Sequence, residues 1–220
     1  MGATGGALAV GRADLRIEGG GADMRLREVA PVADGDLPLA ALKDQLRLGS
    51  GFADEGGQDA VLRGWLRAAL AAVERRLDKA LISRSFILDL PGWSDAEAQV
   101  LPIAPVSAIT EVKLFDAGGA SSVLDGARWR LVADAHRPRL EGQHLTLPVL
   151  PKGGRVEIAL TAGFGSFAQL PPDLRQAVLM LAALYHDHRH EGLAPVSAMP
   201  FGVAALLEPW RVVRSFGGRR

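Results

Sequence analysis

Two blocks of helical periodicity flank a block of short alternating segments, and this order is the strongest constraint on the fold. Apolar residues recur every three or four positions over about residues 38–80 and about 172–190. Between them, over about 84–164, short alternating runs are divided by glycine and proline. A βαβ chain would interleave the two patterns instead of separating them. We therefore predict an α+β fold in which the helices pack together and an antiparallel β region is inserted between them.

The longest helical pattern runs from about Asp59 to about Ala80. Its apolar residues form one stripe: Leu62, Trp65, Leu66, Ala69, Leu70, Val73 and Leu77. Asp59 can cap this helix, and Asp36 can cap a shorter amphipathic helix that has Pro38 in its first turn. A later helix is predicted to begin at Pro172. Its apolar face is formed by Leu174, Val178, Leu181 and Tyr185. These stripes predict helices that are buried against one another.

The inserted region contains several short segments with strand-like alternation. The predicted strands are residues 83–90, 109–116, 127–132, 143–149 and 155–160, the last of which precedes a TAGFG turn. The DAGG sequence at 116–119 predicts a hairpin turn. The two prolines of LPIAPV, residues 101–106, favour an edge strand or an extended connection. This spacing predicts an antiparallel sheet or a small barrel.

The two ends of the chain differ in character from the predicted domain at 37–192. Residues 1–36 are rich in glycine without a clean period, and we expect a flexible arm. Residues 193–220 read as a hinge followed by a docking segment. That segment carries large apolar residues and arginines: Trp210, Arg211, Val213, Arg214 and Phe216. A terminal segment cannot bury such residues on itself, so it either folds back on its own domain or docks on a partner.

Composition excludes several classes of function. The chain has no cysteine, which removes disulfides, thiolate catalysis and cysteine-based zinc sites. Its 25 basic and 25 acidic residues balance, which argues against a whole surface built for nucleic acid or anionic lipid. No apolar run reaches the roughly 18–20 residues of a membrane span. Dinucleotide, Walker and nucleophile-elbow motifs are missing from the sequence, and we expect neither an enzyme nor a cofactor.

Three histidines near the end of the last long helical pattern leave one enzymatic alternative open. His186 and His190 are spaced as two metal ligands on one helix face would be, and His188 lies between them. The segment lacks the HExxH arrangement and picks out no third ligand. A metal-dependent hydrolase is therefore the alternative, and a solvated helix end is the simpler interpretation.

Two groups of charged residues are candidate contact surfaces. Four arginines gather in the β region, which leaves non-specific DNA binding as an alternative: Arg128, Arg130, Arg137 and Arg139. On the long helix, Arg75, Arg76 and Asp78 are candidates for contact with neighbouring subunits. Glu74 and Lys79 are most simply read with them as exposed charge pairs at helical spacing.

Four segments, in this order, carry a resemblance to a known family. They are LPLAALKDQLRL, then DAVLRGWLRAALAAVERRLDKALISRSFILDL, then LPIAPVSAITEVKLFDAGG, and then VEIALTAGFGSFAQLPPDLRQAVLMLAALYHDHR. Together they resemble the head–tail connector, or adaptor, proteins of long-tailed bacteriophages and gene transfer agents. The first 36 residues are not covered, and the family often has Asn or Glu where this chain has His186 to His190.

The resemblance implies a structural adaptor in the neck of a virion or gene transfer agent particle, made in the bacterial cytoplasm. Such proteins form a ring of about twelve copies under the portal protein and extend the DNA channel toward the tail. The expected partners are the portal, other copies of the chain, a stopper or tail-terminator protein below, and DNA that passes non-specifically. The helices would build the ring, and the C-terminal segment would reach the portal.

Overall fold

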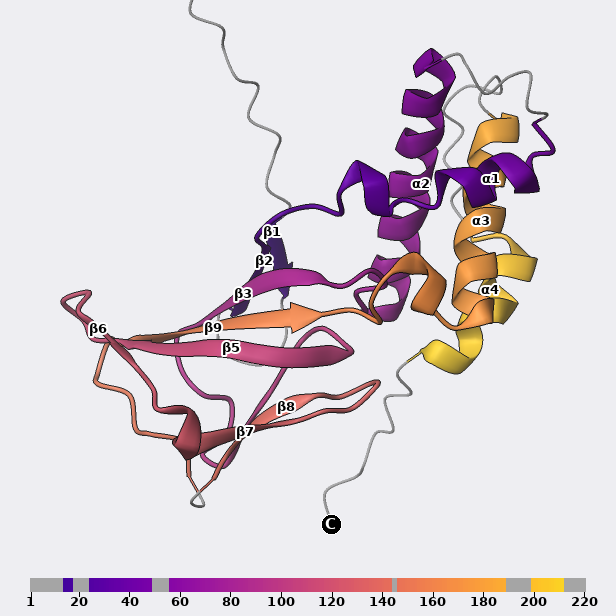
Figure 1. Ribbon diagram of the computed structural model, residues 1–220. Coiled ribbons are helices and arrows are strands. Elements are labelled where there is room, and N and C mark those ends of the chain that lie inside the picture. The colour runs from indigo at the N-terminus through magenta and orange to yellow at the C-terminus, as the bar shows by residue number, and fades with distance from the viewer. Residues whose placement is uncertain (1–13, 18–23, 49–55, 144–145, 189–198, 212–220) are drawn as a thin grey trace, which may run out of the picture.

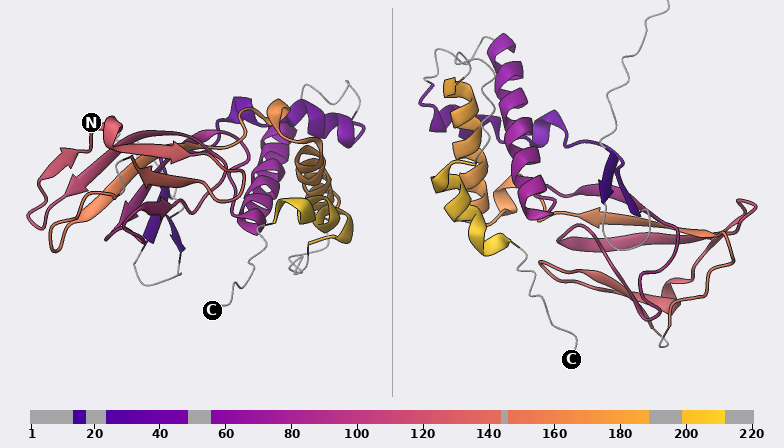
Figure 2. Two further views of the ribbon diagram at one scale, coloured as in Figure 1. Left: turned by 90° about the horizontal axis from the view of Figure 1, so that it is seen from below. Right: turned by 180° about the vertical axis from the view of Figure 1, so that it is seen from behind.

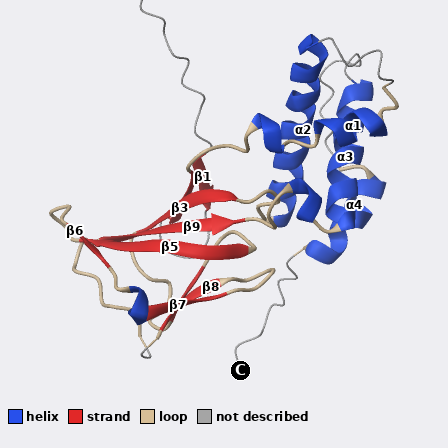
Figure 3. Ribbon diagram, viewed as in Figure 1, coloured by secondary structure: helices blue, strands red, loops and turns tan. Residues whose placement is uncertain are grey.

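The computed structural model describes residues 14–17, 24–48, 56–143, 146–188 and 199–211. A helical bundle lies beside a β region formed by two sheets, and the helix nearest the sheets is α2 (Figures 1 and 2). The chain enters the bundle, leaves it to build most of the sheets, and returns to it (Figure 3). The α+β class is confirmed, with the β region inserted between helices as predicted.

Four α-helices form the bundle in the described part of the chain. They are α1 (Leu39–Gln45), α2 (Gly56–Leu77), α3 (Pro172–Asp187) and α4 (Phe201–Leu207). The predicted stripe of α2 is buried against α3, where Leu66, Val73 and Val178 are each 0% exposed. Each such side chain contributes about 1.5–3 kcal/mol through burial. The helical period therefore predicted α1, α2 and α3 and the faces that α2 and α3 bury, whereas α4 lies in the segment that was expected to be a hinge and docking segment.

All pairings between strands of the two sheets are antiparallel. The larger sheet has the order β1-β2-β3-β9-β5-β6 and the smaller one the order β4-β8-β7. The strands are β1 (Asp14–Ile17), β2 (Met24–Glu28), β3 (Arg84–Leu90), β4 (Ala98–Val100), β5 (Val106–Phe115), β6 (Ser121–Val123), β7 (Trp129–Val132), β8 (Arg139–Gly142) and β9 (Arg155–Ala162). Leu88, Val112 and Ile158 of the larger sheet share a core with Leu140 of the smaller one.

A short loop connects β9 to the bundle and bonds to segments from both halves of the molecule. The backbone N–H of Gly163 donates to Pro105, that of Phe164 donates to Leu81, and that of Ser83 donates to Gly165. Gly163 has a φ of +130°, and a Cβ at this position would lie 2.4 Å from the Cα of Ser83. Only glycine fits this crossing, because the backbone conformation and the close approach both exclude a side chain.

Part of the predicted flexible arm is ordered, so that interpretation is wrong for β1 and β2. β2 pairs with β3, and its Leu26 is 3% exposed in the β core. Residues 24–27 alternate apolar and polar side chains as a strand requires, but this pattern is too short to stand out after the glycines that precede it. The larger sheet therefore begins before the first helix and not at residue 84.

Three local predictions also need correction. Residues 146–149 are not a strand, and the partner of β7 is β8, which ends at Gly142. Asp36 lies in a 3₁₀ turn, and α1 has Pro38 at its N-cap without a side-chain bond. Asp59 is inside the first turn of α2 and not its cap, because the helix already begins at Gly56. There its carboxylate pairs with Lys43 of α1 at 2.6 Å.

Candidate subunit interface on helix α2

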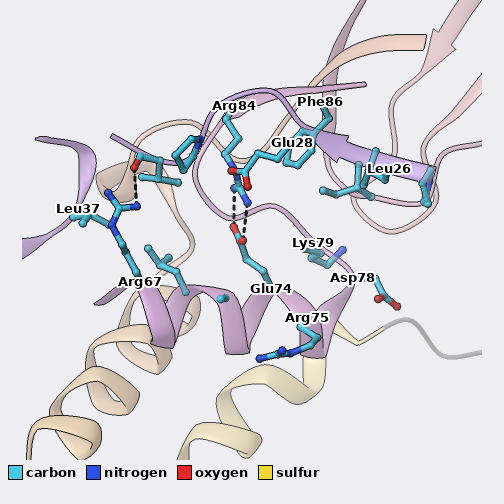
Figure 4. Close-up of a pocket in the computed structure, with 16 residues that line it drawn as sticks. Leu26, Glu28, Leu37, Arg67, Glu74, Arg75, Asp78, Lys79, Arg84 and Phe86 are labelled. Carbon is cyan, nitrogen blue, oxygen red and sulfur yellow. Dashed lines mark hydrogen bonds and ion pairs between the residues drawn. The ribbon is translucent and has the colours of Figure 1, made fainter. Parts of the chain in front are cut away.

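An apolar groove of about 370 Å³ runs along α2 on the side that faces the hairpin β1–β2 (Figure 4). Its walls come from α2, β2, the start of β3 and the connection before α1. Apolar side chains form most of its lining: Leu26, Val32, Leu37, Leu70, Ala71, Phe86 and Ile103. The groove is therefore shaped for an apolar group, with charged side chains along its rim.

Arg84 joins three segments of the chain at this groove. Its guanidinium bonds to both carboxylate oxygens of Glu74 at 2.9 and 2.8 Å and also pairs with Glu28. Glu74 Oε1 accepts a further bond from the backbone N–H of Leu81 at 2.8 Å. Burial alone would lower the pKa of Arg84, but the hydrogen bonds and charge of Glu74 and Glu28 raise it overall. This bidentate geometry holds α2, β2 and β3 together.

Lys79 is buried at the end of α2, with an exposed fraction of 2%. Its ammonium group bonds to the carbonyl oxygen of Ala135 and lies 3.4 Å from Nδ1 of His136. Burial lowers the pKa of Lys79, and the nearby charges of Asp134 and Asp78 only partly oppose this effect. Lys79 thus ties α2 to the turn between β7 and β8.

The prediction that Glu74 and Lys79 form exposed charge pairs on their helix is wrong. Both reach partners in the β region instead: Glu74 accepts from Arg84 of β3, and Lys79 donates to Ala135 in the turn between β7 and β8. Helical spacing describes only neighbours on the same helix, so it could not indicate Arg84 or Ala135.

The three predicted interface residues do lie together at the surface. Arg75 and Arg76 are exposed on the last turn of α2, and Asp78, exposed just after the helix ends at Leu77, has a φ of +55°. Arg75 and Asp78 line the groove, whereas Arg75 and Arg76 line a second hollow between α2, α3 and the residues before α4. The predicted residues therefore lie between two concave surfaces, which is the kind of place where a neighbouring subunit binds. Their role in the interface stays a prediction.

Trp210 folds back on its own domain. Its indole N–H bonds to Asp173 of α3 at 2.5 Å, and its ring meets Phe164 edge-on at 5.7 Å. Arg211 forms an ion pair with Glu208 at 3.1 Å. Val213, Arg214 and Phe216 lie outside the described residues. The structure thus fixes the base of the predicted docking segment, and its docking role stays a prediction.

The histidines do not form a metal site in the part of the chain that the structure describes. His186 Nδ1 lies 3.2 Å from Oδ1 of Asp187, its neighbour in sequence, and His190 is outside the described residues. Within the described ranges, no group of three or more His, Cys, Asp or Glu residues could hold a metal ion.

Two of the four arginines in the β region are already paired with a carboxylate. Arg130 and Arg139 both form ion pairs with Glu141, and Nη2 of Arg130 lies 2.7 Å from Oε2 of Glu141. The hydrogen bonds from Arg139 and Arg130 lower the pKa of the Glu141 carboxyl group. Arg128 and Arg137 are exposed. This pairing offsets much of the positive charge that a DNA-binding surface would need.

Comparison with solved structures places the chain among particle components. It is 54% identical to a chain in the neck of an empty gene transfer agent particle determined with six-fold symmetry, with a TM-score of 0.79. It is 54% identical to a chain of a native gene transfer agent virion, with a TM-score of 0.77. A third match, 50% identical with a TM-score of 0.75, is to the neck of a native particle determined with twelve-fold symmetry. Each match covers 89% of this chain and 99% of the other.

The fold and these matches define a structural component of a particle neck, not an enzyme. The chain belongs to the family of neck proteins of gene transfer agent particles, within the head–tail connectors that its sequence resembles. Neither a protein-family model nor a curated protein matches it. Because the matched chains are structural proteins of a particle neck, the hydrolase alternative is wrong. Within the described residues, no helix is long and apolar enough to cross a bilayer.

Proposed function

We propose that this chain is the head–tail adaptor of its particle. In this proposal it forms a ring beneath the portal, extends the DNA channel and joins the portal to the tail. The supporting observation is the 54% identity, over 89% of the chain, to a protein from the neck of a gene transfer agent particle. At this level of identity, and with a TM-score of 0.79, the two chains share a fold.

The symmetry of the related necks supports ring formation. The matched necks were determined with six-fold and twelve-fold symmetry, and a ring requires each copy to bind its neighbour through two different surfaces. The exposed residues Arg75, Arg76 and Asp78, between two hollows on α2, are candidates for this contact. We propose a ring of about twelve copies.

The C-terminal segment is the proposed contact with the portal. The indole of Trp210 holds the base of this segment against α3 through its bond to Asp173. Arg211, Val213, Arg214 and Phe216 would supply apolar and basic contacts to the portal, and a ring would repeat these contacts around the axis. A stopper or tail-terminator protein would bind below the ring, and DNA would pass through without sequence-specific contact.

Deletion of residues 212–220 tests the adaptor proposal. The deletion spares Trp210 and its bond to Asp173, so the domain should fold normally. A chain shortened by residues 1–13 is the matched control at the other end. We expect the intact chain and the control to join the purified cognate portal as a ring, measured by the mass of the complex. The truncated chain should remain folded and unbound. Normal assembly of the truncated chain would contradict the docking role of the segment.

A further inference from the structure

Phe201 is an aromatic side chain that the described part of the chain leaves almost fully exposed. It is the first residue of α4 and is 89% exposed. The residues just before it, Met199 and Pro200, line the second hollow together with Arg76. An aromatic ring in water on a structured surface is a common mark of a contact site.

The groove on the other side of α2 has the complementary character. It is an open hollow of about 370 Å³ with a mostly apolar lining, and Ala71 on α2 is one of its small, exposed wall residues. This volume accommodates a phenylalanine side chain. The hydrogen bonds between Arg84 and Glu74, which both line the groove, hold β3 against α2, so the groove is preformed (Figure 4).

The two surfaces point in directions that suit a ring. At 100° per residue, groove positions 71 and 74 lie about 150° around α2 from positions 72 and 76 of the second hollow, and Arg75 between them lines both hollows. In a twelve-membered ring, the directions from one copy to its two neighbours differ by about 150°. With α2 parallel to the ring axis, a contact between one surface and the other would lead around a closed ring.

Charge complementarity favours the same pairing. Arg76 is exposed beside the second hollow, and Asp78 is exposed at the rim of the groove. Among the described residues, neither forms an ion pair within its own chain. When the two surfaces meet, Arg76 of one copy faces Asp78 of the next.

We propose that Phe201 of one copy inserts into the groove beside α2 of the next copy, with Arg76 opposite Asp78. This inference rests on the ring of the proposed function and assigns the contact that closes it. The contact is heterologous, since each copy offers its aromatic residue on one side and its groove on the other.

The absence of cysteine makes a direct cross-linking test possible. The double variant Phe201→Cys with Ala71→Cys is assembled with the portal and mildly oxidised. We expect a ladder of disulfide-linked multimers on a denaturing gel. A matched control pairs Phe201→Cys with Val123→Cys, because Val123 is exposed on β6, far from the groove in sequence and fold. The control should give no ladder.

The outcomes separate this contact from the proposed function. Rings of normal mass that show no ladder would overturn the insertion of Phe201 while leaving the adaptor role intact. If the unmodified chain forms no ring with its portal, the adaptor role itself is refuted, and the contact that depends on it is refuted too. As a second measurement, Phe201→Ser should weaken ring assembly at least tenfold with an unchanged circular dichroism spectrum, whereas Phe201→Leu should assemble nearly normally. Normal assembly of Phe201→Ser would also overturn the proposal.

Discussion

The indole N–H of Trp210 donates a hydrogen bond to Oδ2 of Asp173, a residue 37 positions earlier in the chain. The bond connects the last described turn to the start of α3. The same ring packs edge-on against Phe164, so an apolar contact and a polar contact act on one side chain. The end of the bundle is therefore held by a side chain that the sequence places in the docking segment.

Replacement of Trp210 should separate these two contacts. Trp210→Phe keeps an aromatic ring beside Phe164 but removes the donor to Asp173, and we expect a loss of about 1 kcal/mol in the free energy of unfolding. Trp210→Ala removes both contacts and should cost about 2–4 kcal/mol. Chemical denaturation measures both changes. Equal losses in the two variants would show that the ring contact contributes nothing.

The glycine at the crossing between the two halves should resist substitution. Gly163→Ala places a Cβ 2.4 Å from the backbone of Ser83 at a φ of +130°, so we expect a loss of about 2–4 kcal/mol. Gly92→Ala is the matched control, because a Cβ there meets nothing within 4 Å. Thermal unfolding compares the two. A control that loses as much as Gly163→Ala would contradict the steric explanation.

The buried amine of Lys79 predicts a pH dependence of stability. Its pKa in the folded protein is lowered, first by burial, so the unfolded chain binds more protons there than the folded chain does. The free energy of unfolding should therefore rise with pH from the lowered pKa up to the ordinary lysine value of about 10.4. Lys79→Met removes this titration. Unfolding by urea between pH 7 and pH 10 should give a positive slope for the difference between wild type and variant, and a flat difference would refute it.

The sequence predicted the parts of the fold that depend on repeated local patterns. The stripe from Leu62 to Leu77 spans several turns, so its period stood out, and β9 alternates over eight residues. The five residues of β2 were too few to stand out among glycines, and their burial depends on pairing with β3.

The candidate interface was predicted only in outline. Arg75, Arg76 and Asp78 could be chosen because their charges fall outside the apolar stripe of α2. The groove beside them could not be predicted, because it depends on how β2 and β3 pack beside α2. Arg84 and Phe86 line it from β3, and Leu26 lines it from β2. Phe201 was overlooked because an aromatic residue in a short apolar segment usually predicts burial, and its exposure is a property of the fold.

The loop around Gly163 also determines how the molecule carries mechanical load. The backbone bonds from Gly163, Phe164 and Ser83 join the loop after β9 to the residue before β5 and to the connection between α2 and β3, and Arg84 adds an ion pair between β3 and α2 beside them. A pull applied to the bundle loads these bonds in parallel and reaches the sheets without first straightening a slack connection. In the proposed adaptor ring, such units would transmit the tension of an attached tail to the capsid as a stiff coupling.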